Sequence, residues 1–397
     1  MELKTKIAEL AEKYFQEIVQ IRRIIHANPE LSFEEYDTSQ VIKTELKKLG
    51  IETISIANTG VTAIINGKNP DSRVMALRAD MDALPIEEAN DVEYKSRKKG
   101  VMHACGHDVH TASLLGAAKI LNDLRDSFEG SIKLIFQPGE EKYPGGASMM
   151  IKEGVLENPR PNHVVGQHVM PLIPVGKVGI REGMFMASAD EIFIRVKGKG
   201  GHGAMPEINI DPVLIASHII VALQQVVSRN ASPKIPSVLS FGKFIANGAT
   251  NVIPDEVYIE GTFRTFNDEW RMEAHKKIKK MAEGIAESMG GNCEIKILVG
   301  YPFLENEPEL TRRVKAYAID YLGEENVLDL DIWMAAEDFA FYTKEVDSCF
   351  YRLGVRNDQQ GITSSVHTPT FNIDENALKI GAGLMAWIAL QELGDKP

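Results

Sequence analysis

An alternation of strand-like and helix-like segments, interrupted once, is the feature that most constrains how this chain can fold. Apolar residues recur at helical spacing over 3–27 and 34–49, and a third helix is expected after His107. Short apolar runs indicate strands at 74–77, 132–136 and 163–168. Alternating strands and helices are typical of a layered α/β domain with a mostly parallel sheet.

The interruption spans residues 190–299 and has a different order of elements. The expected elements, in chain order, are a strand at 191–196, a helix at 212–228, strands at 238–245 and 257–263, a helix at 269–289 and a strand at 293–298. The order β-α-β-β-α-β predicts a ferredoxin-like α+β unit.

The chain has 397 residues, more than a single hydrophobic core usually organises, so we expect two domains. Residues 1–186 and 301–397 are predicted to form the layered α/β domain, and residues 187–300 the inserted α+β domain. An insertion of this kind explains how residues near position 105 and near the C-terminus can contribute to one site.

Composition and charge favour a cytoplasmic protein without a nucleic-acid or membrane partner. The net charge is -12, whereas phosphate contacts require a basic face. Charges occur throughout residues 1–15, so no secretory signal is expected. Polar residues interrupt the longest apolar stretch, 213–227, which indicates a helix rather than a membrane span. A reducing compartment is favoured by three cysteines without paired spacing, Cys105, Cys293 and Cys349.

The hexapeptide His103–Asp108 concentrates two histidines, a thiol and a carboxylate. These are the ligand types that borderline-soft divalent metals prefer. Further candidates lie beside Gly, Pro or a loop, and the full set is Cys105, His107, Glu141, His168 and His367. Five ligands suffice for two metals if one ligand bridges them and water fills an open position. His168 and His367 have no local motif of their own, so each taken singly also fits a packed core histidine.

Four carboxylates near these candidates have further expected roles. Glu140 and Glu141 follow a strand, and adjacent side chains of an extended chain point to opposite sides. One can then bind metal while the other faces the substrate as a general base. Asp80 and Asp82 have a spacing of two at a strand end, which suits carboxylates that orient metal-bound histidines. A turn role before Pro85 is an equally good interpretation of either one.

Gly198–Gly203 matches the pattern G-x-G-x-x-G of dinucleotide-binding loops. Pro206 and several loop residues separate it from the next expected helix, so no helix N-terminus would meet a pyrophosphate. The glycines instead allow His202 to project from a flexible turn.

The chain resembles the M20-type metallopeptidases over nearly its whole length. Six motifs occur in the order seen in that family: His103–Asp108, Gln137–Glu141, Gly166–Pro171, Gly198–Pro206, Asn251–Pro254 and His367. Peptidase members commonly have a metal-binding His where this chain has Asp80, and a bridging Asp where it has Cys105. In both respects the chain is similar to the amidohydrolase branch, which includes hippurate hydrolases, aminoacylases and auxin-conjugate hydrolases.

The resemblance implies a role for each motif residue. The metal ligands are implied to be Cys105, His107, Glu141, His168 and His367. Glu140 is implied to be the general base, with Asp82 as a supporting catalytic carboxylate, and His202 is implied to stabilise the oxyanion. Asn251 and Arg264 match positions that hold the substrate carboxylate, for which the planar guanidinium is suited.

The expected reaction is hydrolysis of the amide bond of N-acyl L-amino acids, which releases a carboxylic acid and a free amino acid. The attacking group is expected to be metal-bound hydroxide, formed with the help of Glu140. Two divalent ions per subunit are implied, with Zn foremost and Mn, Co or Ni as alternatives. Two other functions remain open: a dinuclear dipeptidase or carboxypeptidase, and a non-catalytic metal-binding protein that kept the fold. Retention of Glu140 argues against the second.

The resemblance also implies a homodimer. The inserted domain would act as a dimerisation and lid domain, and would carry His202 into the active site of the partner subunit.

Overall fold

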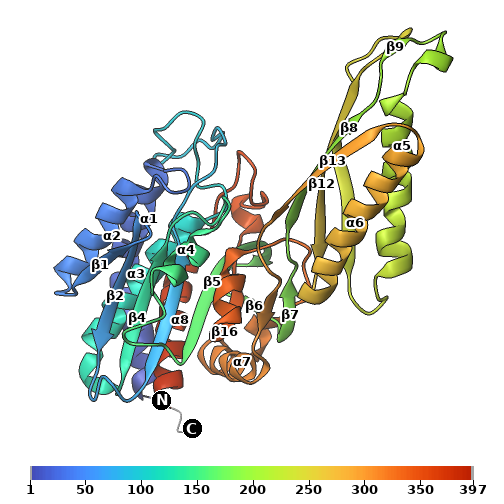
Figure 1. Ribbon diagram of the computed structural model, residues 1–397. Coiled ribbons are helices and arrows are strands. Elements are labelled where there is room, and N and C mark those ends of the chain that lie inside the picture. Colours follow the sequence, from blue (N-terminus) through green and yellow to red (C-terminus); the bar gives the residue numbers. More distant parts are fainter. Residues whose placement is uncertain (1, 395–397) are drawn as a thin grey trace. The chain divides into compact units, whose positions relative to one another are not determined.

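The computed structural model describes residues 2–394, which form two compact units (Figure 1). The first unit comprises the described residues up to Gly183, then Glu305–Asp331 and the described residues from Asp338 on. The second comprises Met184–Leu304 and Ile332–Glu337. The sequence pattern placed the boundaries at 186/187 and 300/301, and it contained no signal for the return of residues 332–337 to the second unit.

The first unit is built on one eight-stranded sheet with the order β1-β2-β4-β3-β5-β16-β6-β15. Its central strands β4, β3, β5 and β16 are mutually parallel. Three pairs of neighbours are antiparallel: β1 with β2, β2 with β4, and β6 with β16. The predicted mostly parallel sheet is confirmed. Its strands are β1 (Thr53–Ile56), β2 (Gly60–Asn66), β3 (Val74–Asp80), β4 (Ser131–Gln137), β5 (His163–Pro174), β6 (Val178–Ile180), β15 (Val327–Asp329) and β16 (Asp347–Arg356).

Helices pack against this sheet and against one another. The helices α3 and α8 pack against each other and against β3, and α1 packs on both of them (Figure 1). This position explains why every residue of α3 from His107 to Leu121 is buried. The helices of the unit are α1 (Glu2–Ala27), α2 (Tyr36–Lys48), α3 (His107–Asp123), α4 (Gly146–Lys152), α7 (Pro308–Leu322) and α8 (Asn376–Gly394).

The second unit has the predicted order β-α-β-β-α-β. Four of its strands form an antiparallel sheet in the order β10-β12-β8-β13. Side chains of Asp211 and Asn267 cap the two helices by accepting hydrogen bonds from the first-turn amides. The elements are β8 (Asp190–Lys197), α5 (Pro212–Gln225), β10 (Ser237–Ile245), β12 (Glu256–Thr265), α6 (Asp268–Ser288) and β13 (Asn292–Val299).

Residues 2–394 contain four further short strands. Within the second unit, β9 (Gly201–His202) pairs antiparallel with β11 (Val252–Ile253), so His202 lies on a small separate ribbon. The other two are β7 (Gly183–Met186) and β14 (Leu304–Asn306), at two of the four places where the chain passes between the units.

One helical stretch among residues 2–394, Pro212–Asn230, is long and apolar enough to cross a membrane by length and composition alone. Its residues Ile215, Ile219 and Leu223 lie in the core of the second unit, and core helices pass the same test.

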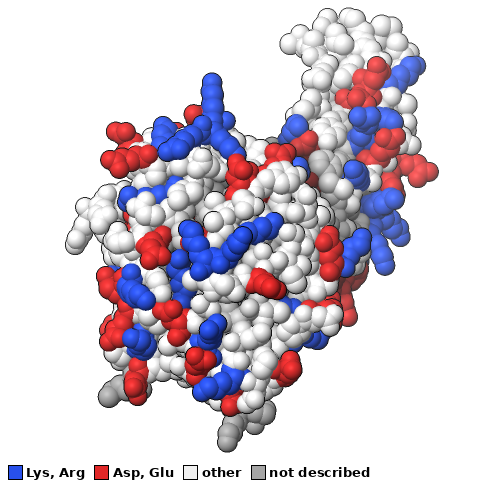
Figure 2. All heavy atoms as spheres, turned by 90° about the vertical axis from the view of Figure 1, so that its left-hand side faces the viewer, with Lys and Arg blue, Asp and Glu red and all other residues white. Residues whose placement is uncertain are grey.

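Lysines, arginines and acidic residues are interspersed over the face shown in Figure 2. The cysteines Cys105, Cys293 and Cys349 are buried and form no disulfide.

Candidate metal centre

The candidate site lies at the carboxyl ends of neighbouring parallel strands of the first unit. Asp80, the last residue of β3, is opposite Gln137, the last residue of β4, and both β4 and β5 pair with β3. The sheet register therefore brings the segments that follow β3 and β4 together. Crevices at such strand ends are the usual ligand sites of parallel α/β sheets.

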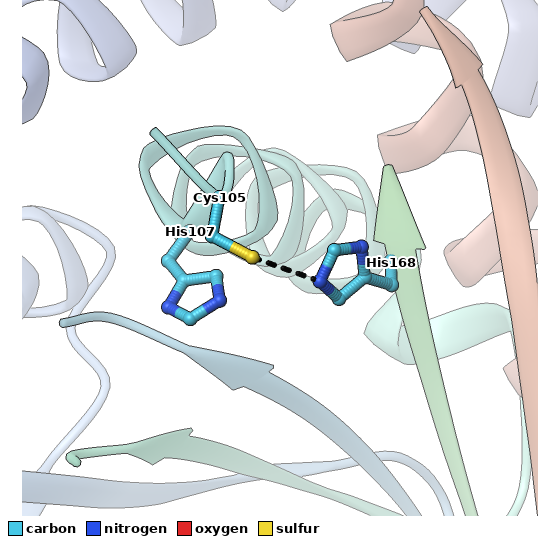
Figure 3. Close-up of side chains that lie close together, drawn as sticks. All are labelled: Cys105, His107 and His168. Atoms are coloured by element: carbon cyan, nitrogen blue, oxygen red, sulfur yellow. Dashed lines mark hydrogen bonds between the residues drawn. The ribbon is translucent and has the colours of Figure 1, made fainter. Parts of the chain in front are cut away.

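Cys105, His107 and His168 form a buried group of three potential metal ligands. Figure 3 shows Cys105 and His168 pointing toward each other with the His107 ring beside them. The Cys105 Sγ atom is 3.4 Å from His168 Nε2. Gly106 makes this turn possible, because its φ is +86° and a Cβ atom there would lie 2.5 Å from a methyl group of Val169.

Cys105 also belongs to a second group, with Glu141 and His367. His367 Nε2 lies 3.3 Å from Cys105 Sγ and 3.2 Å from Glu141 Oε1. A backbone hydrogen bond of 2.8 Å, from His367 N to Ala104 O, fixes the C-terminal segment against the turn that carries Cys105. All five predicted ligands thus fall into two groups that share Cys105.

Asp80 and Asp82 each contact a histidine. Asp82 Oδ1 accepts a hydrogen bond of 3.0 Å from His107 Nδ1, which leaves His107 Nε2 free to face a metal. Asp82 Oδ2 accepts the backbone amide of Glu141 at 3.0 Å. The Asp80 carboxylate pairs at 2.5 Å with Nδ1 of a different histidine, His110, and lies 3.7 Å from His107 Nε2.

The expectation that Glu140 and Glu141 point to opposite sides is wrong. One oxygen of each carboxylate lies within 4.8 Å of the other and of a His107 nitrogen. The strand ends at Gln137, and Gly139 adopts a left-handed φ of +57°, so the glutamates follow a turn rather than an extended chain. Both carboxylates therefore face a common space.

The donor set of this site fits divalent metal. The His107 Nε2 atom is buried and has no hydrogen-bond partner among the described residues. The Glu141 Oε1 atom is also buried and has no hydrogen bond there, and His367 Nε2 lies 3.2 Å from it. Burial opposes the charged form of His107, but Asp80 and Asp82 outweigh it and raise its pKa to about 10. Burial and Glu141 raise the pKa of Cys105 well above its usual value. A cation would relieve the excess negative charge and stabilise the thiolate.

Sequence reasoning missed three residues of this region. His110 lies one turn after His107 on α3, so the i, i+3 spacing of the two histidines was the available signal. Arg78 is fully buried and donates to Asp80 at 2.7 Å and to Asp338 at 2.8 Å. The backbone amide of Asp338 in turn donates to Glu140 Oε1 at 3.3 Å. No local pattern linked Asp338 to positions near 78 and 140.

The other predicted site residues lie in the second unit. His202 is exposed on β9, and its backbone pairs with Val252, next to Asn251, which is also exposed. Arg264 is half-buried on β12 and donates to the Met334 carbonyl at 3.0 Å. The structure thus brings His202 and Asn251 together on one ribbon. Within residues 2–394, no hydrogen bond joins Arg264 to either of them.

Several known proteins are similar to this chain over most of its length. The chain is 39% identical to IAA-amino acid hydrolase ILR1-like 4 of Arabidopsis thaliana, over 99% of this chain and 90% of the relative. It is 41% identical to N-acetyl-L-cysteine deacetylase of Bacillus subtilis, over 91% and 85% of the two chains. It is also 38% identical to thermostable carboxypeptidase 2 of Saccharolobus solfataricus, over 98% and 99%.

A solved structure and a protein-family model also match this chain. The crystal structure of the Bacillus subtilis YXEP protein, described as a dinuclear metal-binding peptidase of the M20 family, matches with a TM-score of 0.83. The identity is 34%, over 97% of this chain and 99% of that chain. The model of peptidase family M20/M25/M40 matches residues 76–391. The chain belongs to this family, as a metal-dependent hydrolase of its amidohydrolase branch.

Proposed function

We propose that this protein hydrolyses the amide bond of N-acyl L-amino acids with the aid of two divalent metal ions. The observation that carries the proposal is the pair of ligand groups that share Cys105, with Glu140 beside His107. Relatives named as an IAA-amino acid hydrolase and an N-acetyl-L-cysteine deacetylase support this substrate class.

In this proposal Cys105, His107 and His168 would hold one ion, and Cys105, Glu141 and His367 would hold the other. Mixed thiolate, imidazole and carboxylate ligands favour Zn, with Mn, Co and Ni as alternatives. When bound, the ions would acidify water and polarise the scissile carbonyl.

Glu140 acts as the proton carrier. Its carboxylate is almost fully buried and faces the same space as the ligand groups. It takes a proton from the attacking water and later gives it to the departing amine, so the carboxylate is regenerated in each cycle. Asp82 supports this step by holding the His107 ring and the Glu141 backbone amide.

The second unit supplies substrate contacts in this proposal. Arg264 and Asn251 hold the carboxylate of the amino-acid part, and His202 stabilises the oxyanion of the tetrahedral intermediate. The exposed position of His202 supports its action on the site of a partner subunit in a homodimer. Exposed apolar side chains on the same part of the unit, Met205, Ile208 and Val252, also favour a covered surface.

A carboxypeptidase or dipeptidase is the second candidate, because a relative at 38% identity is named a carboxypeptidase. Both candidates act on substrates that end in a carboxylate, so the nature of the group on the other side of the amide distinguishes them.

A substrate screen tests the choice. Protein treated with a chelator and reloaded separately with Zn, Mn, Co or Ni would be assayed on N-acetyl, N-benzoyl and N-succinyl amino acids and on dipeptides. We expect no turnover without metal and faster hydrolysis of the N-acyl amino acids with metal. Faster cleavage of the dipeptides would favour the second candidate. Full activity in protein shown by elemental analysis to lack metal would exclude the proposed mechanism.

A further inference from the structure

The segment Ser32–Glu35, which none of the motifs includes, packs against the loop Pro138–Glu141, which we call the base loop. Glu35 Oε1 accepts the backbone amide of Gly139 at 2.8 Å. Glu35 is fully buried although it stands beside an exposed glutamate, Glu34. Burial of a carboxylate is energetically unfavourable unless the group is paired or hydrogen-bonded, so a buried glutamate at this position needs partners.

Hydrogen bonds from three donors hold the Glu35 carboxylate. Oε1 accepts the amide of Phe33 at 2.9 Å as well as that of Gly139, and Oε2 accepts the Thr59 hydroxyl at 2.6 Å. Burial and the nearby Asp82 raise the pKa of Glu35 to about 7, although the Thr59 hydroxyl and the Phe33 amide favour its charged form.

The ring of Phe33 closes the other side of Gly139. A Cβ atom on Gly139 would lie 2.2 Å from Phe33 Cε1, so only glycine fits against the ring. Phe33 itself has a φ of +70°, a conformation that bulky residues rarely adopt. Two hydrogen bonds hold Phe33 in this conformation. Its amide donates to the Glu35 carboxylate, and its carbonyl accepts from the Asn58 side chain.

The other end of the base loop has a similar anchor. Asp82 Oδ2 accepts both the amide of Glu141 at 3.0 Å and the hydroxyl of Ser32 at 2.6 Å. The amides on either side of Glu140 are therefore each held by a buried carboxylate, Glu35 before it and Asp82 after it.

We infer that Glu35 is a positioning residue, which fixes the base loop so that Glu140 and Glu141 face the metal centre. This inference rests on the proposed function for its consequence in catalysis. Its structural part, that Glu35 holds Gly139, stands on the contacts alone. Displacement of a catalytic group by about 1 Å can cost roughly 100-fold in rate, so a loosened base loop should act mainly on kcat.

Four variants test the inference. Glu35→Ala removes the acceptor of the Gly139 amide, whereas Glu35→Gln keeps an acceptor oxygen and a polar group for Thr59. Thr59→Val removes one buried hydrogen bond of Glu35 but leaves the Gly139 contact. Glu34→Gln changes the exposed neighbour and serves as the matched surface control.

Hydrogen exchange of the base loop, followed by mass spectrometry on metal-loaded protein, gives a readout independent of activity. In Glu35→Ala the exchange should become faster by about tenfold or more, which corresponds to one lost buried hydrogen bond. In the other three variants it should stay close to wild type. Unchanged exchange in Glu35→Ala would overturn the inference, whatever the wild-type protein hydrolyses.

Turnover provides the second readout. Glu35→Ala at saturating metal should lose about 100-fold in kcat with little change in KM, and Glu35→Gln should recover most of that loss. If Thr59→Val loses as much kcat as Glu35→Ala at an equal loss of thermal stability, the effect is general destabilisation and the inference fails. If wild type hydrolyses no N-acyl amino acid, the proposed function fails, and the exchange result alone decides whether Glu35 holds the base loop.

Discussion

Glu140 and Glu141 are neighbours whose carboxylates face the same nitrogen of His107, so only substitution can separate a proton carrier from a ligand. Glu140→Gln should keep its bound metal and lose about 10²- to 10⁴-fold in turnover, because an amide cannot accept the proton of water. Glu141→Gln should bind metal more weakly, because a ligand charge is lost. Metal content and kcat, measured on both variants, test this assignment. If both bind metal normally and only Glu141→Gln is inactive, the two roles are exchanged.

Arg264 offers a second test at the scale of one residue. Arg264→Ala should raise KM for N-acyl amino acids by an amount equivalent to about 2–5 kcal/mol, since a charged hydrogen-bonded partner of the substrate is removed. The matching N-acyl amides, which lack the carboxylate, should be affected much less. Arg195→Ala is a suitable control, because Arg195 lies on the neighbouring strand β8 and is half exposed. Equal losses for acids and amides would count against a carboxylate contact.

At the scale of elements, a buried charge network ties α1 to the segments that carry the ligands. Arg22 on α1 donates to Asp108 at 2.7 Å, next to His107, and to Glu375 at 3.3 Å, in the segment after His367. Burial opposes ionisation of Asp108, but Arg22 and His26 hold its pKa well below the usual range. The helix α1 therefore supports the metal centre although it contributes no ligand.

Arg22→Met should destabilise the protein by about 3–5 kcal/mol at pH 7, because it leaves Asp108 buried without its main cation. Arg23→Met should cost about 0–1 kcal/mol, since Arg23 is partly exposed.

The lowered pKa of Asp108 contributes stability above its unfolded value of about 3.9, and this contribution is lost as the pH falls. The difference between wild type and Arg22→Met should therefore shrink below about pH 4. Chemical unfolding at pH 7 and in acid tests this, and a difference that grows in acid would contradict it.

Elements with a strong local pattern could be predicted from the sequence. The order β-α-β-β-α-β of 190–299 and the long helix at the N-terminus follow from periodic apolar residues, and the structure confirms both. The turn at Gly139 could not be predicted, because its left-handed backbone depends on Phe33 and Glu35, which are distant in sequence. For the same reason the contact between Asp338 and Glu140 had no signal, since tertiary packing alone creates it.

At the scale of the whole molecule, the remaining question is whether one chain forms a complete site. His202 is exposed on a ribbon of the second unit, and apolar side chains around it, including Met205 and Val252, are also exposed. Isolated exposed apolar residues need no explanation, but a group of them beside a catalytic candidate favours contact with another chain. We therefore expect a homodimer whose sites combine the metal centre of one subunit with His202 of the other.

Complementation tests this expectation directly. His202→Ala and Glu141→Gln should each be inactive as homodimers, the first without its oxyanion donor and the second without a metal ligand. In a mixed dimer, the intact metal centre of the His202→Ala subunit meets the intact His202 of the Glu141→Gln subunit. Co-expression should then restore about a quarter of the wild-type activity, because half of the dimers are mixed and each contains one complete site. Two different affinity tags, used in sequence, isolate the mixed dimers. If these dimers form and remain inactive, His202 does not act across the dimer.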